Sequence, residues 1–356
     1  MACLSGASLP APYLSKDRGE KLLLENAEKA LDYLERIAPE HPQCEFGFNI
    51  ALQYIATARN WDRAVALLPK AKPGFNFLSQ LLENSRHPSM ADKMLDMVIA
   101  GEAETMNFRG LMTELPKRVR PDMAPKILES IPKTTGRNRS TLLSALGRTA
   151  DPRGWDILER EIFNDLPNAA QAAEILEYFP GERALVALRK LLKSTNYQGF
   201  PHAARILADR GDHSGIPALI ERLQTTTVDV EKRWYMGALA AIRGQSLPKL
   251  ADYSTPPNTG VFLDEYWAWW QKNKSRSRVE WLLESLEEGL GVSPYPPHPL
   301  LILAQEDVRD VPADWPEERR RNEIVKRVRA WIAKTGFAFT KDNVRVHEPA
   351  KRELGR

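Results

Sequence analysis

Apolar and polar positions alternate with a helical period along most of the chain. The first clear example begins at Gly19, where leucines and alanines recur at helical spacing with Glu and Lys between them. Pro39 and Pro42 end this helix, because proline lacks the amide hydrogen that a helix interior needs. No strand-like alternation of useful length follows. The pattern therefore predicts an all-α protein.

Residues 49–99 predict short helices separated by polar turns. Asn60-Trp-Asp and Arg86-His-Pro-Ser are the turns, since they combine polar residues with a proline or a capping side chain. The expected helices are Asn49–Ala58, Arg63–Leu68, Phe77–Asn84 and Met90–Ile99.

From residue 111 onward the same pattern recurs every 30 to 32 residues. A pair of apolar residues opens the first helix of each unit: Leu111-Met112, Leu142-Leu143, Ala172-Ala173, Ala203-Ala204 and Tyr235-Met236. The second helices carry four apolar columns in phase: Trp155, Leu185 and Ile216; Ile157, Ala187 and Ala218; Leu158, Leu188 and Leu219; Ile162, Leu192 and Leu223. A helical hairpin cannot cover its own apolar face, so each unit is expected to stack on its neighbours.

The turns between these helices carry the residues that a sharp reversal needs. Asp151-Pro152 supplies a capping side chain followed by a fixed φ. Pro180-Gly181 and Gly211-Asp212 occupy the same place in later units, where glycine suits a left-handed helix end. Asp212 or Ser214 is expected to cap the following helix.

Two segments, Leu146-Gly-Arg-Thr-Ala-Asp-Pro-Arg-Gly-Trp-Asp-Ile-Leu158 and Leu207-Ala-Asp-Arg-Gly-Asp-His-Ser-Gly-Ile-Pro-Ala-Leu219, resemble HEAT repeats. They are most similar to the short bacterial type that is also found in phycobilisome lyases. The resemblance is good over about residues 110–250 and looser from about 20 to 110. It implies an α-solenoid of stacked helical hairpins, an armadillo-like helical protein whose second helices line the concave face. Such repeats serve many unrelated partners, so the resemblance specifies the fold better than the function.

The chain after the repeats predicts a helical C-terminal cap rich in aromatic residues. In the helix expected over 261–273, Tyr266, Trp269 and Trp270 share one face and Trp267 points elsewhere. This aromatic face either closes the open end of the repeats or stacks on a ligand, and we favour the first because terminal units must cover their last apolar face. Further helices are expected over 278–290 and 316–334.

The predicted organisation has five parts. They are a leader (1–18), divergent helical repeats (19–109), HEAT-like repeats (110–252), the aromatic-rich helical cap (253–335) and a polar tail (336–356).

Composition narrows the class of protein without naming its function. The 356 residues are 43% apolar and carry a net charge of +3, which gives no general basic excess for nucleic-acid binding. Cys3 and Cys44 are too few for a disulfide scaffold or a zinc site. No apolar run approaches the ~20 residues of a membrane span. We expect a soluble, bacterial, cytoplasmic protein, or a periplasmic or lipid-anchored one if the true start lies upstream of Met1-Ala2-Cys3.

The sequence carries no catalytic motif. None of the six histidines forms a zinc-binding pair, and no phosphate-binding glycine loop or nucleophile elbow occurs. We interpret His213 as a solvated turn residue, and Glu159 and Glu161 as part of a solvated helix face. The prediction is that the chain has no catalytic residues, binds no metal and needs no cofactor.

The candidate partner-binding residues lie on the second helices, which the resemblance places on the concave face. They are Arg160, Arg189, Lys190, Lys193, Glu221 and Arg222. Glutamates are interspersed among the basic residues, so we interpret this surface as mixed, with a basic strip for phosphate or nucleic acid as the alternative.

Three functional hypotheses follow. The first is a non-catalytic scaffold that binds a protein partner through its concave face. The second is lyase- or chaperone-like handling of a bound ligand such as a tetrapyrrole. The third is nucleic-acid binding, as in HEAT-like DNA glycosylases. The sequence predicts no oligomeric state.

Overall fold

In the part of the chain that the computed structural model describes, helices are joined by turns and short irregular segments, and no residue belongs to a strand. The predicted all-α class is therefore confirmed. The predicted leader, and the start of the helix expected from Gly19, lie outside the described residues. The structure describes residues 24–40, 45–68, 77–85, 87–102, 109–165, 169–245, 259–289 and 298–343.

The described residues form two compact units that meet in sequence between Trp155 and Asp156, inside the region predicted as HEAT-like repeats. The first unit contains α2 (Ala27–Ile37), η2 (Ala38–Glu40), α3 (Glu45–Ile55), α4 (Trp61–Ala66), α5 (Phe77–Asn84), α6 (Met90–Ile99), α8 (Arg109–Arg118), η4 (Pro121–Met123), α9 (Ala124–Ser130), η5 (Ile131–Lys133), α10 (Gly136–Thr149) and η6 (Pro152–Gly154). Its helices pack on near neighbours in the chain, as α5 on α8 and α8 on α10 do.

Helices α5 and α6 coincide with the predicted ranges, whereas α3 begins earlier and ends earlier than predicted. A buried turn ends it. The Thr57 backbone N–H donates to Asn60 Oδ1 at 2.7 Å, and the Asn60 N–H donates to Thr57 Oγ1 at 3.1 Å. Asn60 Nδ2 also donates to the Ile55 carbonyl. Side chains therefore form hydrogen bonds with backbone groups at the end of the helix.

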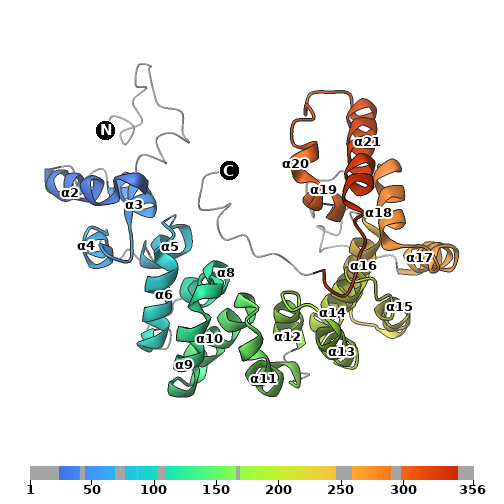
Figure 1. Ribbon diagram of the computed structural model, residues 1–356, viewed down its shortest axis with the longest axis horizontal. Helices are drawn as coiled ribbons and strands as arrows, with labels where there is room; N and C mark the ends of the chain where they lie inside the picture. Colours follow the sequence, from blue (N-terminus) through green and yellow to red (C-terminus); the bar gives the residue numbers. More distant parts are fainter. Residues whose placement is uncertain are drawn as a thin grey trace. The chain divides into compact units, whose positions relative to one another are not determined.

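The boundary falls after the first residue of α11 (Trp155–Leu158). The second unit contains the rest of α11, η7 (Glu159–Phe163), α12 (Ala169–Leu176), α13 (Glu182–Leu191), α14 (Gly199–Ala208), α15 (Gly215–Thr225), α16 (Asp229–Arg243), α17 (Thr259–Asn273), α18 (Arg278–Glu287), α19 (Pro299–Leu303), α20 (Gln305–Val308) and α21 (Glu317–Thr335). Helices α12, α14 and α16 pack side by side and form what we call the groove row. Helices α13 and α15, the outer row, pack against its other side (Figure 1).

The repeating apolar positions lie in the core, as the sequence predicts. The paired residues that open the first helices are buried in α10, α12, α14 and α16, and of the earliest pair Leu111 is buried while Met112 is partly exposed. In the outer row Leu185, Leu188 and Leu219 are buried, whereas Ala218 and Leu192 are partly exposed. Burial of one apolar stripe per helix is what stabilises short helices such as these.

The turns of the second unit follow the predicted chemistry. Gly181 and Gly211 adopt positive φ angles of 86° and 75°, which glycine accepts without strain. Asp212 Oδ1 accepts a hydrogen bond from the Ser214 N–H at 2.9 Å and so orders the turn before α15. Of the two expected capping residues, Asp212 therefore makes the side-chain contact.

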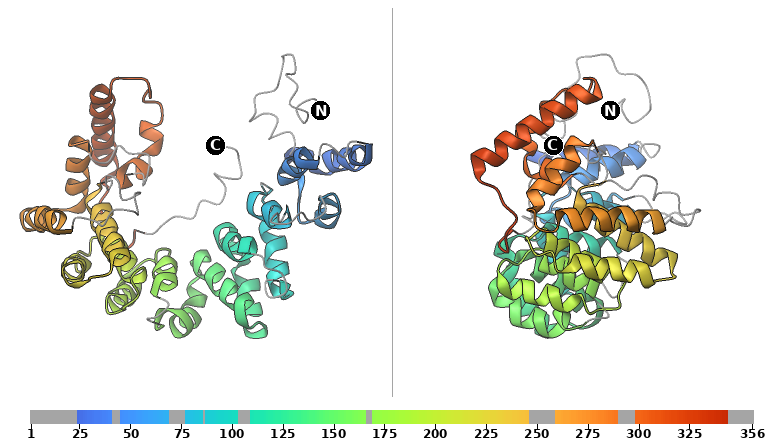
Figure 2. Two further views of the ribbon diagram at one scale, coloured as in Figure 1. Left: turned by 180° about the vertical axis from the view of Figure 1, so that it is seen from behind. Right: turned by 90° about the vertical axis from the view of Figure 1, so that its right-hand side faces the viewer.

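The C-terminal elements bury the predicted aromatic face. Tyr266, Trp269 and Trp270 of α17 lie in a core cluster with Leu239 of α16, whereas Trp267 is 45% exposed. Helix α21 packs on α18 and ends at Thr335, and the positive φ of 64° at the following Gly336 turns the chain back (Figure 2). The described part of the predicted polar tail is not free: the Gly181 N–H donates to the Lys341 carbonyl at 3.1 Å.

Candidate functional site

A groove of about 750 Å³ runs over the groove row of the second unit. Its lining comes from all three helices and the residue before α14: Ala170, Gln171 and Glu174; Gln198, Pro201, His202 and Arg205; Val230, Arg233, Trp234, Gly237, Ala238 and Ala241. Grooves of this volume with an apolar lining and a few polar groups are typical of ligand and peptide sites. We therefore treat this groove as the candidate site.

Small residues hollow the groove out. Ala170, Gly237 and Ala241 carry little or no side chain, so the surface between α12 and α16 lies low. The helices themselves are held close by Gly199 at the start of α14. A Cβ atom on Gly199 would lie 2.4 Å from the backbone carbon of Ala169 and from the backbone nitrogen of Ala170. Only glycine permits this approach.

Two large apolar side chains stand at the groove beside the small ones. Trp234, on the first half of α16, is 44% exposed, and Val230 lies one turn earlier and is equally exposed. An exposed tryptophan beside a hollow is the usual anchor of a protein interface, because its large surface is desolvated when a partner binds.

Arg205, the charged side chain of α14 at the groove, is held by carboxylates at the ends of α12 and α14. Arg205 Nη2 donates to Glu177 Oε1 at 2.9 Å, and Arg205 Nη1 donates to Asp209 Oδ2 at 3.0 Å. Burial opposes the charge of Arg205, but Asp209 and Glu177 outweigh it and raise the pKa of the guanidinium. Asp209 Oδ1 also lies 2.5 Å from Nη1 of Arg278, which is 2% exposed. The groove therefore presents a fixed cation between two carboxylates.

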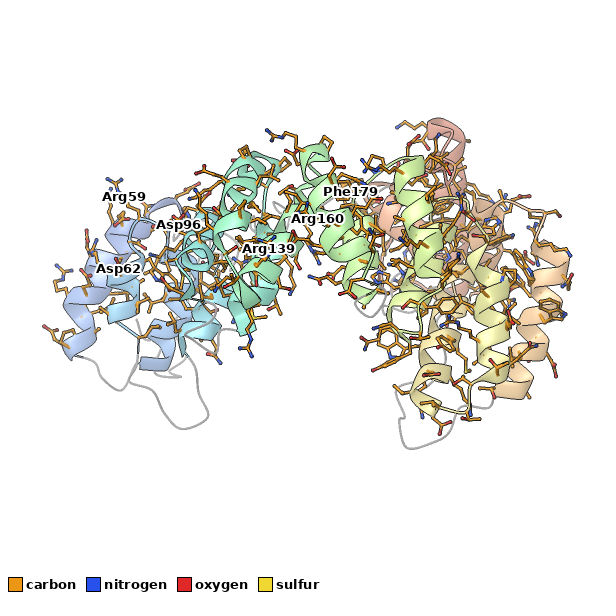
Figure 3. All side chains as sticks on the ribbon, turned by 90° about the horizontal axis from the view of Figure 1, so that it is seen from below. Arg59, Asp62, Asp96, Arg139, Arg160 and Phe179 are labelled. Carbon is orange, nitrogen blue, oxygen red and sulfur yellow. The ribbon has the colours of Figure 1, made fainter. Side chains whose placement is uncertain are left out.

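The six predicted partner-binding residues lie elsewhere in the second unit, and none lines the groove. Arg160 is on η7 (Figure 3), and it pairs with Glu161 at 2.9 Å. Arg189 pairs with Glu182 and Asp212, and Lys190 Nζ donates to Asn164 Oδ1. These contacts join exposed side chains of the outer row and its connections.

The remaining three predicted residues differ in their exposure to solvent. Lys193 and Glu221 are exposed. Arg222 is partly buried: its guanidinium carbon lies 3.9 Å from the centre of the Phe200 ring, and Nη2 reaches the Leu192 carbonyl at 3.5 Å. Arg222 therefore does not project from the core as its place in the repeat predicts, because the ring of Phe200 offers a cation–π contact.

Sequence patterns did not bring together the residues that form the groove. Trp234 and Arg205 carried no motif, and the small residues are informative only when neighbouring helices are aligned. One available signal was the spacing of Trp234, Gly237 and Ala241, which places a large and two small residues on one face of α16.

His213 is not a solvated turn residue, contrary to the prediction. Its ring lies 4.4 Å from the Trp281 ring and edge-on to Trp270 at 6.3 Å. Burial, with the positive charge of Arg278, lowers its pKa, and Asp212 acts in the opposite direction. The described residues contain no group of three potential metal ligands. His213 is therefore partly buried and packs against the aromatic rings of the core.

One serine and one histidine come together in the first unit. Ser89 Oγ lies 2.8 Å from His87 Nδ1 and accepts a hydrogen bond from the Ala58 N–H at 2.9 Å. The Ser89 N–H also donates to His87 Nδ1. These contacts tie the turn before α6 to the end of α3, so we assign them a structural role.

No protein-family model, curated protein or solved structure matches this chain. None of the described helices is long and apolar enough to cross a bilayer.

Proposed function

We propose that the protein is a HEAT-like α-solenoid whose groove on α12, α14 and α16 binds an extended segment of a protein partner. The single observation that carries the proposal is the groove itself, with its small-residue floor and the exposed ring of Trp234. Two neighbouring helix pairs with buried apolar columns support the solenoid architecture, which the sequence resemblance implies.

A protein segment suits the groove better than a nucleic acid does. The amide groups of Gln171 and Gln198 belong to types that bond peptide backbone, and Trp234 offers apolar surface for one side chain. Glu174 and Glu177 lie at or beside the groove, and carboxylates there repel phosphates. The mixed charge therefore favours a partner segment that carries both signs of charge around an apolar residue.

A selection with a displayed library of random 12-residue peptides tests this proposal. We expect the full-length protein to enrich peptides with a shared apolar residue flanked by polar ones. Ala241→Trp, which places a large ring in the groove, should abolish their capture. Val186→Trp adds the same ring to an outer-row position that is 58% exposed, and should leave capture unchanged. Equal capture by both variants would place the binding surface outside the groove.

The volume of the groove also lies within the range of small-ligand pockets, so handling of a compact ligand such as a tetrapyrrole is the second candidate. Titration with bilin distinguishes the two. Tight, saturable binding of bilin that Ala241→Trp removes, together with no enriched peptide, would favour the ligand over the protein partner. Salt-sensitive binding of a DNA duplex would instead favour the nucleic-acid hypothesis.

A further inference from the structure

The segment after α21, residues 337–341, lies as a strap across two turns of the second unit (Figure 2). At one end its Lys341 carbonyl accepts the Gly181 N–H. In the middle, the Phe339 carbonyl lies only 2.6 Å from the place where a Cβ on Gly211 would be. Both turns carry a glycine, and at Gly211 the strap and the glycine fit each other closely.

The strap also covers a buried arginine. The guanidinium carbon of Arg278 lies 4.9 Å from the centre of the Phe339 ring. Phe339 in turn meets Phe337 edge-on at 5.1 Å, and Phe337 lies 5.1 Å from Trp331 of α21. Because a cation over an aromatic face is stabilised most where water is excluded, Phe339 helps to hold Arg278 in its buried position.

The carboxylate of Asp209 links Arg278 to the groove. One oxygen of Asp209 forms an ion pair with Arg278 Nη1 at 2.5 Å, and the other accepts a hydrogen bond from Arg205 Nη1. Arg205 lines the groove, so three side chains connect the strap to it: Arg278, Asp209 and Arg205. The contacts between them are direct, and each side chain carries the opposite charge to the one it contacts.

We propose that the docked strap regulates the groove by fixing Arg205 through Arg278 and Asp209. This inference rests on the proposed function, because it concerns the regulation of the same groove. When the strap leaves, water reaches Arg278, its contact with Asp209 weakens, and Arg205 loses part of its fixed geometry. A partner then has to order Arg205 on binding, which lowers its affinity.

Coupling of this kind is reciprocal. If a docked strap raises the affinity of the groove by a given factor, an occupied groove stabilises the docked strap by the same factor. Coupling between two sites usually amounts to a 5- to 150-fold change. The Gly181 amide reports strap docking, because its N–H is bonded to the Lys341 carbonyl.

The first experiment needs no ligand. Hydrogen exchange of the Gly181 amide is compared in the parental protein, in Arg205→Gln and in Arg222→Gln. Arg222 is a partly buried arginine outside the network and serves as the matched control. We expect exchange at Gly181 to quicken at least fivefold in Arg205→Gln relative to the Leu207 amide, which reports global unfolding, and to change less than twofold in the control. Equal changes in both variants would overturn the coupling.

The second experiment measures the affinity of a peptide selected on the groove. Phe339→Ala should weaken binding at least fivefold, and Phe339→Tyr, which keeps the ring over Arg278, should stay within twofold. In an Arg205→Gln background Phe339→Ala should have no further effect. Unchanged affinity in Phe339→Ala would overturn the regulatory role. A positive first experiment with no selectable peptide would instead contradict the proposed function and leave the coupling between strap and groove established.

Discussion

The helices of the groove row and of the outer row in the second unit all bury an apolar stripe, but the two rows differ in where their polar contacts lie. The contacts of the outer row are exposed: Arg183 reaches Asp156 and Glu159, and Arg189 reaches Glu182 and Asp212. Those at the end of the groove row are buried. Exposed ion pairs contribute little to stability, whereas removing one partner of a buried pair is costly. The two kinds of charged residue look alike in the sequence.

Each helix of the groove row ends in a polar contact with a buried side chain from another part of the chain. At the end of α12, Arg210 Nη2 donates to the Leu176 carbonyl at 2.6 Å, and burial lowers the pKa of Arg210 to about 10. Just after α14, Asp209 pairs with Arg278. After α16, Ser285 Oγ donates to the Gly244 carbonyl at 2.6 Å. These contacts satisfy the carbonyls that a helix end leaves unpaired or anchor the turn beside them.

The largest effect is expected where an arginine is removed from this buried end. Arg278→Met should lower the free energy of unfolding by about 2–3 kcal/mol, because Asp209 loses a fully buried partner but keeps its contact with Arg205. The same change at the exposed Arg183, on the outer row, should have little effect. Chemical denaturation of both variants measures the difference. Similar losses at the two sites would remove the distinction between the rows.

The buried histidine beside the end of α16 should make stability depend on pH. His298 is 2% exposed, and burial, with a smaller contribution from Arg278, lowers its pKa to about 4. Its unfolded pKa is near 6.5, so the unfolded chain binds a proton first, and stability falls as the pH drops from 6.5 toward 4. The expected loss from this group is about 2 kcal/mol at pH 5.

His298→Asn isolates this contribution. His298 Nδ1 accepts the Leu300 N–H at the start of α19, and asparagine can accept the same hydrogen bond without titrating. The variant should therefore lose less stability than the parental protein between pH 7 and pH 5. His213, whose pKa is also lowered, should keep a residual slope in the same direction. An unchanged slope would show that His298 does not titrate as its burial implies.

A smaller effect is expected from the glycine that brings α12 and α14 together. Gly199→Ala should lower the free energy of unfolding by about 1–3 kcal/mol, because the added methyl meets the backbone of Ala169 and Ala170. Gly237→Ala makes the same change on α16, where the residue faces the groove. There the higher helix propensity of alanine should leave stability equal or slightly increased. Thermal denaturation compares the two, and equal losses would contradict the close approach at Gly199.

The smallest effect on stability is expected for the residue most important to the proposed function. Trp234→Ala should change the free energy of unfolding by less than about 1 kcal/mol, because nearly half of the side chain is already exposed. The same variant should lose most of its affinity for groove-selected peptides, since a tryptophan of this kind anchors an interface. Calorimetric titration checks binding, and urea denaturation checks folding. A large loss of stability would identify Trp234 as a core residue.

The sequence predicted the helices and their buried stripes well, because a repeated apolar column such as Leu158, Leu188 and Leu219 reports burial directly. It also identified the positive-φ turn at Gly211 and the buried face of Tyr266, Trp269 and Trp270. These features depend on residues that are close along one helix or within one turn.

The groove could not be predicted in the same way. It depends on Ala170, Pro201 and Gly237, which lie on three helices and are each unremarkable alone. The contact between Phe339 and Arg278 joins residues 61 positions apart, and no local pattern links them. Exposed arginines and lysines were predicted as partner-binding residues because charge can be read from a sequence, whereas the space between helices cannot.

The affinity of one groove-selected peptide for three forms of the protein tests the central claim most directly. The parental protein and Val186→Trp should bind the peptide equally, and Ala241→Trp should bind it at least tenfold more weakly while keeping the same unfolding midpoint. Equal affinity for all three forms would contradict the assignment of the groove on α12, α14 and α16 as the binding site.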